Sequence, residues 1–268
     1  MPATLAAYLQ RINYDLPVRP DLATLIGVHR AHLLNITYEN LDIHRGCSLT
    51  VDFDTFYTKI VEARRGGWCF EMNGLLAWAL REIGFEVTLL ASAVGRASVD
   101  EPFAPDHLIL RVDLDQPYLA DVGFGNGLLE PIPLAAGRYR QAGWLEFGLR
   151  QVGDRWWFEN QAYGGPGFDF NLEPYQLADF AAESHYLQTS PESGFVRTTV
   201  CHRYVPEGIV TLRGAVLRRV TVEGQRDELI SDAASYARTL ADVFDLHLDD
   251  IDALWEKVWA RHQAWVQK

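Results

Sequence analysis

The sequence predicts an α+β fold, because two different hydrophobic periods occupy separate stretches of the chain. Over roughly the first 85 residues, apolar side chains recur at three-and-four spacing, which is typical of amphipathic helices. From about residue 86 the period changes to two, which is typical of strands, and roughly the last 40 residues return to a helical pattern. Helices followed by strands and a mixed tail favour α+β over a doubly wound parallel sheet, in which strands and helices alternate.

Four helices are predicted ahead of the strands. Asp21 can cap the second and Asp52 or Asp54 the third, since a short carboxylate accepts hydrogen bonds from the free backbone N–H groups at a helix start. Gly84 can end the fourth, because glycine readily adopts the left-handed conformation found after helices. The predicted helices cover residues 4–12, 21–36, 52–65 and 69–85.

The strand-like part of the chain contains two clear hairpin turns, at residues 152–155 and 212–215. A strongly amphipathic helix is predicted near the end of the chain, over residues 249–265. The predicted strands cover residues 86–95, 107–114, 117–125, 144–161, 195–205 and 208–224.

Composition and charge narrow the class of protein. With 268 residues, 48% of them hydrophobic, the chain can build a sizeable core. Its formal net charge of -12 disfavours nucleic-acid binding, which depends on neutralising phosphates, although a local patch can still bind an anionic cofactor. No apolar stretch approaches the roughly 18 residues of a membrane span, and the N-terminus lacks a secretion signal. We therefore expect a cytoplasmic protein with neither nucleic-acid nor membrane partners.

The three cysteines, Cys47, Cys69 and Cys201, indicate free thiols. They cannot all pair within one chain, and none belongs to a C-x-x-C motif, so neither a disulfide framework nor a zinc knuckle is indicated. Free thiols fit a reducing compartment. The sequence also lacks an H-E-x-x-H motif, a calcium loop and a phosphate-binding glycine motif, and we expect no metal.

Cys69 stands out because the segment "RRGGWCFEMNG" (64–74) places it at the first turn of a predicted helix. The residues Met72, Leu76, Leu80 and Ile83 follow it at helical spacing, so Cys69 is expected to face the core. At a helix start, free N–H groups and the helix dipole favour a thiolate. The alternative is that Cys69 is a small buried hydrophobic residue, as most free cysteines are.

A base for this thiol is predicted in the hairpin formed by residues 107–123. If the turn is centred on Leu114, His107 lies opposite Asp121 on one face, and a slip of two residues leaves them diagonal neighbours. Asp121 could then fix the imidazole tautomer and leave the other ring nitrogen for a thiol. The alternative is an incidental polar pair on a surface hairpin.

Together these segments resemble the arylamine N-acetyltransferase family. The "RRGGWCFEMNG" segment is similar to the family's active-site cysteine segment, while "PDHLIL" (105–110) and "LADVGFG" (119–125) resemble its histidine and aspartate segments. Their order and spacing match, and "ITYENLDIH" (36–44) and "FDFNLEPYQLADF" (168–180) also resemble family segments.

The resemblance implies a helical bundle, a β-barrel and an α/β lid, with a catalytic core like that of cysteine proteases and transglutaminases. On this basis we expect residues 1–86 to form the bundle that carries the nucleophilic cysteine. Residues 87–190 would form the barrel that carries the histidine and aspartate, and residues 191–268 the lid with the C-terminal helix.

The resemblance also implies residue roles. Cys69 would be the acetyl-accepting nucleophile, His107 its base and Asp121 the residue that orients the base. Two aromatic residues would line the acceptor pocket and an ion pair would support the cysteine loop; these are Tyr38 with Phe124, and Glu39 with Arg64.

The implied activity is transfer of an acetyl group from acetyl-CoA, through an acetyl-cysteine, to an aromatic amine or hydrazine. The expected partners are these small molecules and coenzyme A, for a protein that is a monomer or a homodimer. A thiol hydrolase or transglutaminase-like enzyme with the same Cys-His-Asp residues is one alternative. A non-catalytic binding protein is the alternative from another class.

Overall fold

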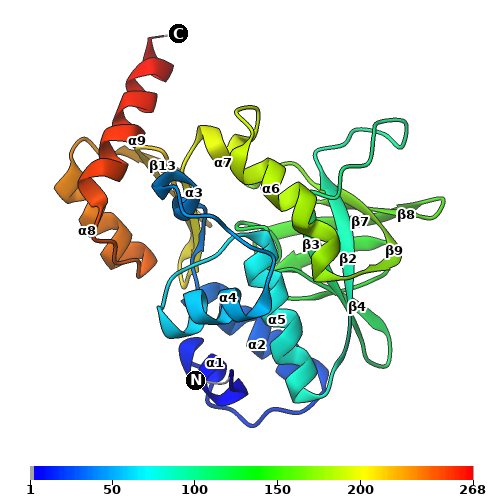
Figure 1. Ribbon diagram of the computed structural model, residues 1–268. Helices are drawn as coiled ribbons and strands as arrows, with labels where there is room; N and C mark the ends of the chain where they lie inside the picture. Colours follow the sequence, from blue (N-terminus) through cyan, green and yellow to red (C-terminus); the bar gives the residue numbers. More distant parts are fainter. Residues whose placement is uncertain (1–2, 268) are drawn as a thin grey trace.

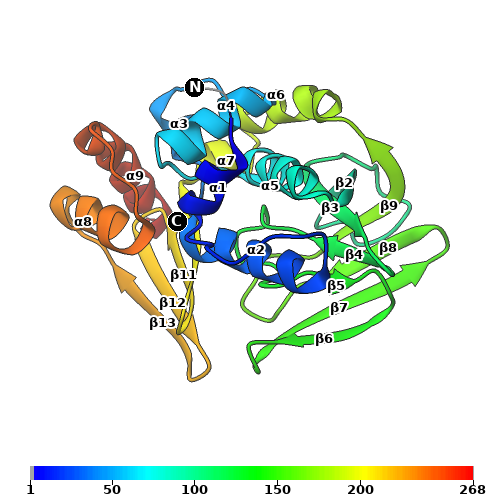
Figure 2. The same cartoon turned by 90° about the horizontal axis from the view of Figure 1, so that it is seen from below.

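The computed structural model describes residues 3–267 and confirms the predicted α+β fold. Figure 1 shows N-terminal helices, a strongly curved sheet in green that forms a nearly closed barrel, and a second sheet flanked by the last two helices. In Figure 2 the N-terminal helices lie between these two sheets. Within residues 3–267, no helix combines the length and apolar character needed to cross a membrane.

The N-terminal helices begin and end largely where the sequence predicts. Asp21 accepts a hydrogen bond from Thr24 N at 2.8 Å, and Asp52, rather than Asp54, caps the third predicted helix. That helix continues into a π-helical turn, η1 (Thr58–Glu62). The α-helices of this part are α1 (Leu5–Arg11), α2 (Leu22–Asn35), α3 (Leu41–Arg45), α4 (Phe53–Tyr57) and α5 (Cys69–Ile83).

Helix α5 occupies the centre of the molecule, between the other helices and the barrel (Figure 2). Most of its side chains are buried, which makes it hydrophobic nearly all round rather than along one stripe. It packs against the first two strands of the barrel, β2 and β3. This position brings its first residue, Cys69, to the barrel's edge.

The barrel sheet is antiparallel throughout, in the order β5-β4-β3-β2-β9-β8-β7-β6. Three of its strands, β5, β6 and β9, were not predicted; β5 has only two residues, and β6 is mostly polar and exposed. The bounds are β2 (Glu86–Val94), β3 (His107–Asp113), β4 (Pro117–Ala120), β5 (Ile132–Pro133), β6 (Gly137–Gln141), β7 (Leu145–Val152), β8 (Arg155–Glu159) and β9 (Phe168–Tyr175).

The register of the β3–β4 hairpin differs from the predicted one. Leu110 pairs with Ala120 and Asp113 with Pro117, so the turn is centred one residue later, on Asp115. In the predicted register, Pro117 would lie within the paired part of the strand, where its missing N–H would leave a hydrogen bond unmade. In the structure Pro117 is the first residue of β4, where a missing N–H is tolerated. His107 and Asp121 are therefore diagonal rather than directly opposite.

The second sheet draws strands from both ends of the chain. Its order is β1-β10-β11-β12-β13, so the short β1 (Tyr38–Glu39) of the N-terminal part joins the C-terminal strands β10 (Val200–Val205), β11 (Gly208–Arg213), β12 (Val216–Thr221) and β13 (Gly224–Leu229). The helices α8 (Ala233–Phe244) and α9 (Ile251–Val266) complete this part. The division into residues 1–86, 87–190 and 191–268 stays a proposal.

A helical segment connects the two sheets. It consists of η2 (Leu177–Phe180), α6 (Ala181–Thr189) and α7 (Gly194–Arg197). The strand predicted over residues 195–205 begins later, at Val200, because Gly194–Arg197 form α7 instead. Ser193 caps this helix by accepting a hydrogen bond from Phe195 N at 3.2 Å.

Candidate active site

Cys69 is the first residue of α5, and its side chain is 2% exposed. Its Sγ lies 4.0 Å from the carbonyl oxygen of Asp106, the residue immediately before His107. The Gly66–Gly67 pair ahead of it allows close approach, because a Cβ on Gly66 would lie only 2.2 Å from Thr37 O. Backbone hydrogen bonds from Gly67 to Thr37 and from Glu39 to Gly67 then fix the loop against β1.

His107 and Asp121 form a buried hydrogen bond of 2.8 Å between Nε2 and Oδ2. A proton on Nε2 satisfies the carboxylate, which leaves Nδ1 as the basic nitrogen of the neutral ring. The diagonal placement in the hairpin thus still brings the two side chains together.

Asn73, one helical turn after Cys69, joins α5 to the loop that carries Asp121. Its Nδ2 donates to Asp121 Oδ1 at 2.8 Å and to Leu108 O at 2.6 Å, while its Oδ1 accepts from Val122 N at 2.9 Å. All the polar atoms of this buried amide therefore contact the two strands that carry the histidine and the aspartate.

Gly123 lets the same loop pack directly against the start of α5. A Cβ at this position would lie 2.8 Å from both Cα and O of Cys69, and 2.6 Å from Asn73 Nδ2. Gly123 N also donates to Asp121 Oδ1 at 2.8 Å. The cysteine, the histidine and the aspartate therefore lie within one tightly packed region.

The protonation states follow from burial and neighbouring charge. Burial raises the pKa of the Cys69 thiol well above its usual range, and the carboxylates of Asp106 and Asp121 add to the rise. The hydrogen bond from Phe70 N–H acts in the opposite direction. Burial thus outweighs the helix-start effect that was expected to favour a thiolate. A thiolate in this site therefore requires a base that takes its proton.

The Asp121 carboxyl behaves differently from the thiol. Burial opposes its ionisation, but His107 and the hydrogen bonds from Asn73 and Gly123 together lower the pKa of Asp121 below its usual value. Asp121 is therefore ionised near neutral pH.

Tyr38 and Phe124 lie in the surroundings of these residues. The ring of Phe124 is 5.0 Å from that of His107 and 5.2 Å from that of Phe168. Burial raises the pKa of the Tyr38 hydroxyl, and charges on Cys69 and Asp121 raise it further, because the hydroxyl lies within electrostatic range of both. An aromatic environment surrounds the base.

The predicted ion pair between Glu39 and Arg64 is wrong by one residue. Glu39 pairs with Arg65 at 2.7 Å, whereas Arg64 is 60% exposed and contacts Asp245 at 3.4 Å. Arg64 has a φ of 52°, a left-handed backbone that turns its side chain outward and the next one inward.

His29 is a residue of this site that the sequence analysis missed. It was set aside for lack of a metal-binding motif, yet its Nε2 accepts from Asp121 N at 3.1 Å and its Nδ1 contacts Leu129 O at 3.1 Å. Burial lowers the pKa of His29 to about 4, so the ring is neutral. Asn73 was missed too, although its spacing of four from Cys69 places both on one helix face.

The described residues, 3–267, hold no group of three or more His, Cys, Asp or Glu side chains suited to a metal ion. A thiol, an imidazole and a carboxylate in this order are typical of nucleophilic acyl transfer.

Comparison with known proteins finds N-acetyltransferases by both sequence and structure. Residues 21–253 match the model of an N-acetyltransferase family. The chain is 33% identical over 237 residues to arylamine N-acetyltransferase 2 of Mesocricetus auratus, which covers 80% of this chain and 82% of that protein.

Solved structures of the same kind are similar over almost the whole chain. The arylamine N-acetyltransferase of Mycobacterium marinum superimposes with a TM-score of 0.88 at 30% identity, covering 95% of this chain and 98% of the other. The structure of that enzyme in complex with CoA gives a TM-score of 0.87 at the same identity and coverage.

Proposed function

Because the chain belongs to the arylamine N-acetyltransferase family, we propose that it transfers acetyl from acetyl-CoA to aromatic amines through Cys69. The observation that carries this proposal is the 2.8 Å hydrogen bond between His107 and Asp121, packed through Asn73 and Gly123 against the helix start that bears Cys69. His107 is the base and Asp121 the residue that orients it.

The first half-reaction loads the enzyme. His107 Nδ1 takes the proton of the Cys69 thiol, and the thiolate attacks the carbonyl carbon of the acetyl thioester. When the tetrahedral intermediate collapses, the bond to the CoA sulfur breaks and the imidazolium returns its proton to that sulfur. One thioester replaces another, so the step is nearly balanced in energy.

The second half-reaction releases the product. The amine nitrogen attacks the acetyl-cysteine carbonyl, and His107 takes the proton that the nitrogen loses. Collapse breaks the bond to Cys69 Sγ, which recovers its proton from the imidazolium. Asp121 holds the imidazole in one tautomer in both halves.

Tyr38 and Phe124 are proposed to line the acceptor pocket. The Phe124 ring lies 5.0 Å from that of His107, and the buried Tyr38 ring lies 5.7 Å from that of His202. An aromatic, poorly hydrated surface favours aromatic amines or hydrazines over water as the acceptor. Glu39 and Arg65 are proposed to take the structural role first assigned to Glu39 and Arg64.

The cellular setting and assembly are part of the same proposal. Three free cysteines, one of them the nucleophile, fit a reducing, cytoplasmic location. The protein is proposed to act as a monomer or homodimer on small-molecule substrates, without a nucleic-acid or membrane partner.

The decisive experiment is intact-mass measurement after incubation with acetyl-CoA. We expect one acetyl group on the wild type and on the control variants Cys47→Ser and Cys201→Ser, and none on Cys69→Ser. Addition of an arylamine should remove the acetyl group and yield the acetylated amine. Rapid loss of the group to water without amine would favour the thiol hydrolase, and the absence of any adduct would favour a binding protein.

A further inference from the structure

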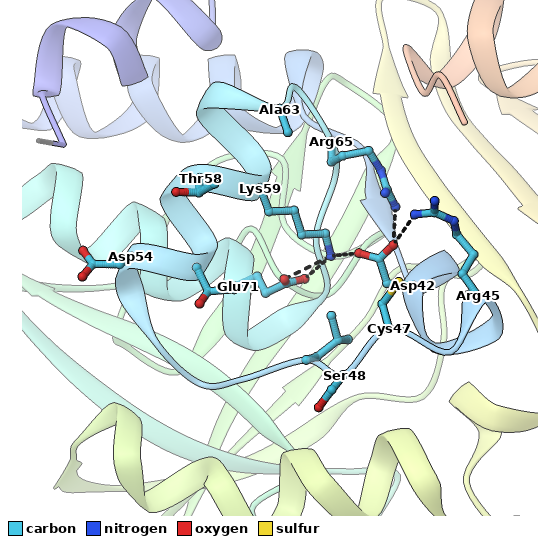
Figure 3. A pocket seen from close by; sticks show the side chains of 12 residues that line it. Asp42, Arg45, Cys47, Ser48, Asp54, Thr58, Lys59, Ala63, Arg65 and Glu71 are labelled. Atoms are coloured by element: carbon cyan, nitrogen blue, oxygen red, sulfur yellow. Dashed lines mark hydrogen bonds and ion pairs between the residues drawn. The ribbon is translucent and has the colours of Figure 1, made fainter. Parts of the chain in front are cut away.

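Lys59 occupies an unusual position for a lysine, because its ammonium is almost buried between two carboxylates. Nζ lies 2.8 Å from Glu71 Oε2 and 3.0 Å from Asp42 Oδ2, and the side chain is 11% exposed. Figure 3 shows these contacts within a cavity of about 550 Å³ that lies between η1, α3 and the start of α5. The π-helical turn η1 aims Lys59 inward, and such turns are frequent at functional sites.

Glu71 connects this ion pair to the reacting thiol. It lies two residues after Cys69 in the first turn of α5, and its Oε2 accepts a hydrogen bond from Trp68 N at 3.1 Å. A Cβ on Gly67 would lie 3.0 Å from Glu71 Cβ, so the carboxylate side chain also packs against the glycine loop. Glu71, which is paired with Lys59, therefore contacts Gly67 and Trp68, the two residues that precede Cys69.

The charged side chains on this side of α5 form one network, in which Lys59 is the cation that contacts Glu71. Asp42 has two further cationic partners, since Arg45 and Arg65 each contact its Oδ1 at 2.9 Å. Glu71 has only Lys59 as a cationic partner among the described residues. The carboxylates of this network are Glu39, Asp42, Glu71 and Asp250, and its cations are Arg45, Lys59 and Arg65.

On the other side of α5, the thiol already faces charges that oppose its ionisation. Asp106 at the end of the β2–β3 loop and Asp121 after β4 both raise the pKa of Cys69, and Glu71 adds a smaller rise. His107 on β3 supplies the only cation proposed to form there. Without the positive charge of Lys59, the opposing effect of Glu71 on the ionisation of Cys69 would be larger.

We propose that Lys59 is a positioning residue for acyl transfer, which neutralises Glu71 and fixes the glycine–tryptophan loop so that the Cys69 thiol can ionise. The inference rests on the proposed role of Cys69 as nucleophile. It goes further by assigning an electrostatic role to Lys59 of η1, which contacts α5 through Glu71 on the side away from His107 and Asp121.

The test is the pH dependence of Cys69 alkylation by iodoacetamide, measured by peptide mass mapping. Lys59→Met removes the positive charge that offsets Glu71, so the midpoint of the profile should move up. Glu71→Gln removes that carboxylate but keeps an acceptor for Trp68 N–H, so the midpoint should move down. In the double variant the two effects should cancel, and the midpoint should lie near that of the wild type.

If the role of Lys59 is electrostatic, the alkylation midpoints of the two single variants move in opposite directions. If its role is only structural, both midpoints move in the same direction. Shifts in the same direction, or no shift in Glu71→Gln, would overturn the inference. If Lys59→Met does not fold, the double variant decides, because its midpoint should lie above that of Glu71→Gln. Arg218→Met, which removes an exposed ion pair with Asp227 on the far sheet, is the control and should leave the profile unchanged.

Alkylation reports on the thiol whether or not acetyl-CoA is the donor. A wild-type protein that is acetylated on Cys69 but shows no shift in the variants would refute the role of Lys59 alone. A protein that shows the shifts but is not acetylated would instead refute the proposed function.

Discussion

Asn73 and Asp121 are joined by a hydrogen bond of 2.8 Å that ties the nucleophile's helix to the loop bearing the aspartate. Because the same amide also bonds to Leu108 O and Val122 N, the relative position of Cys69 and Asp121 is set by side-chain geometry as well as by the fold. The carboxylate has three donors, His107, Asn73 and the backbone of Gly123, and each is matched to an acceptor oxygen.

Asp121→Asn should abolish most of the activity while keeping the shape of the site. An amide presents only one acceptor oxygen, so it cannot satisfy the three donors, and it can hold the imidazole in the wrong tautomer. We expect the rate of Cys69 acetylation to fall by roughly 10⁴-fold, as for the loss of the orienting carboxylate in other triads. The measurement is quenched-flow intact mass, with circular dichroism to verify folding. Near-normal acetylation in a folded variant would contradict the proposed role of Asp121 in orienting His107.

Gly123→Ala should weaken the site through sterics rather than charge. The added methyl would lie 2.8 Å from backbone atoms of Cys69, which cannot move without shifting the start of α5. We expect a destabilisation of about 1–3 kcal/mol, the range for overpacking, together with slower acetylation.

Gly165→Ala is the matched control, because a Cβ there would meet no atom within 4 Å. Urea unfolding and acetylation rates of both variants check the prediction. Equal behaviour of the two variants would show that the Asp121 loop can retreat from Cys69 without cost.

His29 should make stability fall as the pH drops below 6.5. Burial lowers its pKa from 6.5 to about 4, so between these values the unfolded chain binds a proton that the folded chain does not. The contribution of neutral His29 to the free energy of unfolding is therefore fully present above pH 6.5 and is lost progressively toward pH 4. At pH 5 the loss from this residue is about 2 kcal/mol.

The variant His29→Gln tests this, since glutamine can keep a hydrogen bond to Asp121 N and one to Leu129 O but does not titrate. Between pH 7 and pH 5, the free energy of unfolding should fall by about 2 kcal/mol more in the wild type than in the variant. The same fall in both proteins would mean that His29 is not a buried neutral group.

The sequence was most informative where local signals coincide with chemistry. Cys69 comes soon after two glycines and begins a helix, as periodicity predicted. His107 and Asp121 flank a short hairpin whose register was assumed, and the family resemblance supplied the roles of all three residues. The diagonal contact survived a shift of the hairpin register because side chains two residues apart still share a face.

What the sequence could not supply depends on backbone torsion and long-range packing. Whether Arg64 or Arg65 faces Glu39 follows from the φ of 52° at Arg64, which adjacent arginines do not reveal. The contacts of Lys59 with Glu71 and of His29 with Asp121 join segments whose approach is set by the tertiary fold. Strand β6, with mostly polar and exposed residues, carries no period to detect.

The kinetic order tests the mechanism beyond the identity of its residues. The site offers one thiol and one imidazole proposed as base, because both ring nitrogens of His29 are already hydrogen-bonded. Both proposed half-reactions use His107 Nδ1, which must return its proton before it can accept another. Acetyl should therefore reside on Cys69 between the halves, with CoA leaving before the amine is acetylated. Double-reciprocal plots of initial rate against acetyl-CoA, at several fixed amine concentrations, should give parallel lines. Intersecting lines would indicate that both substrates are bound together when the acetyl group moves, and Cys69 would then have no need to carry it.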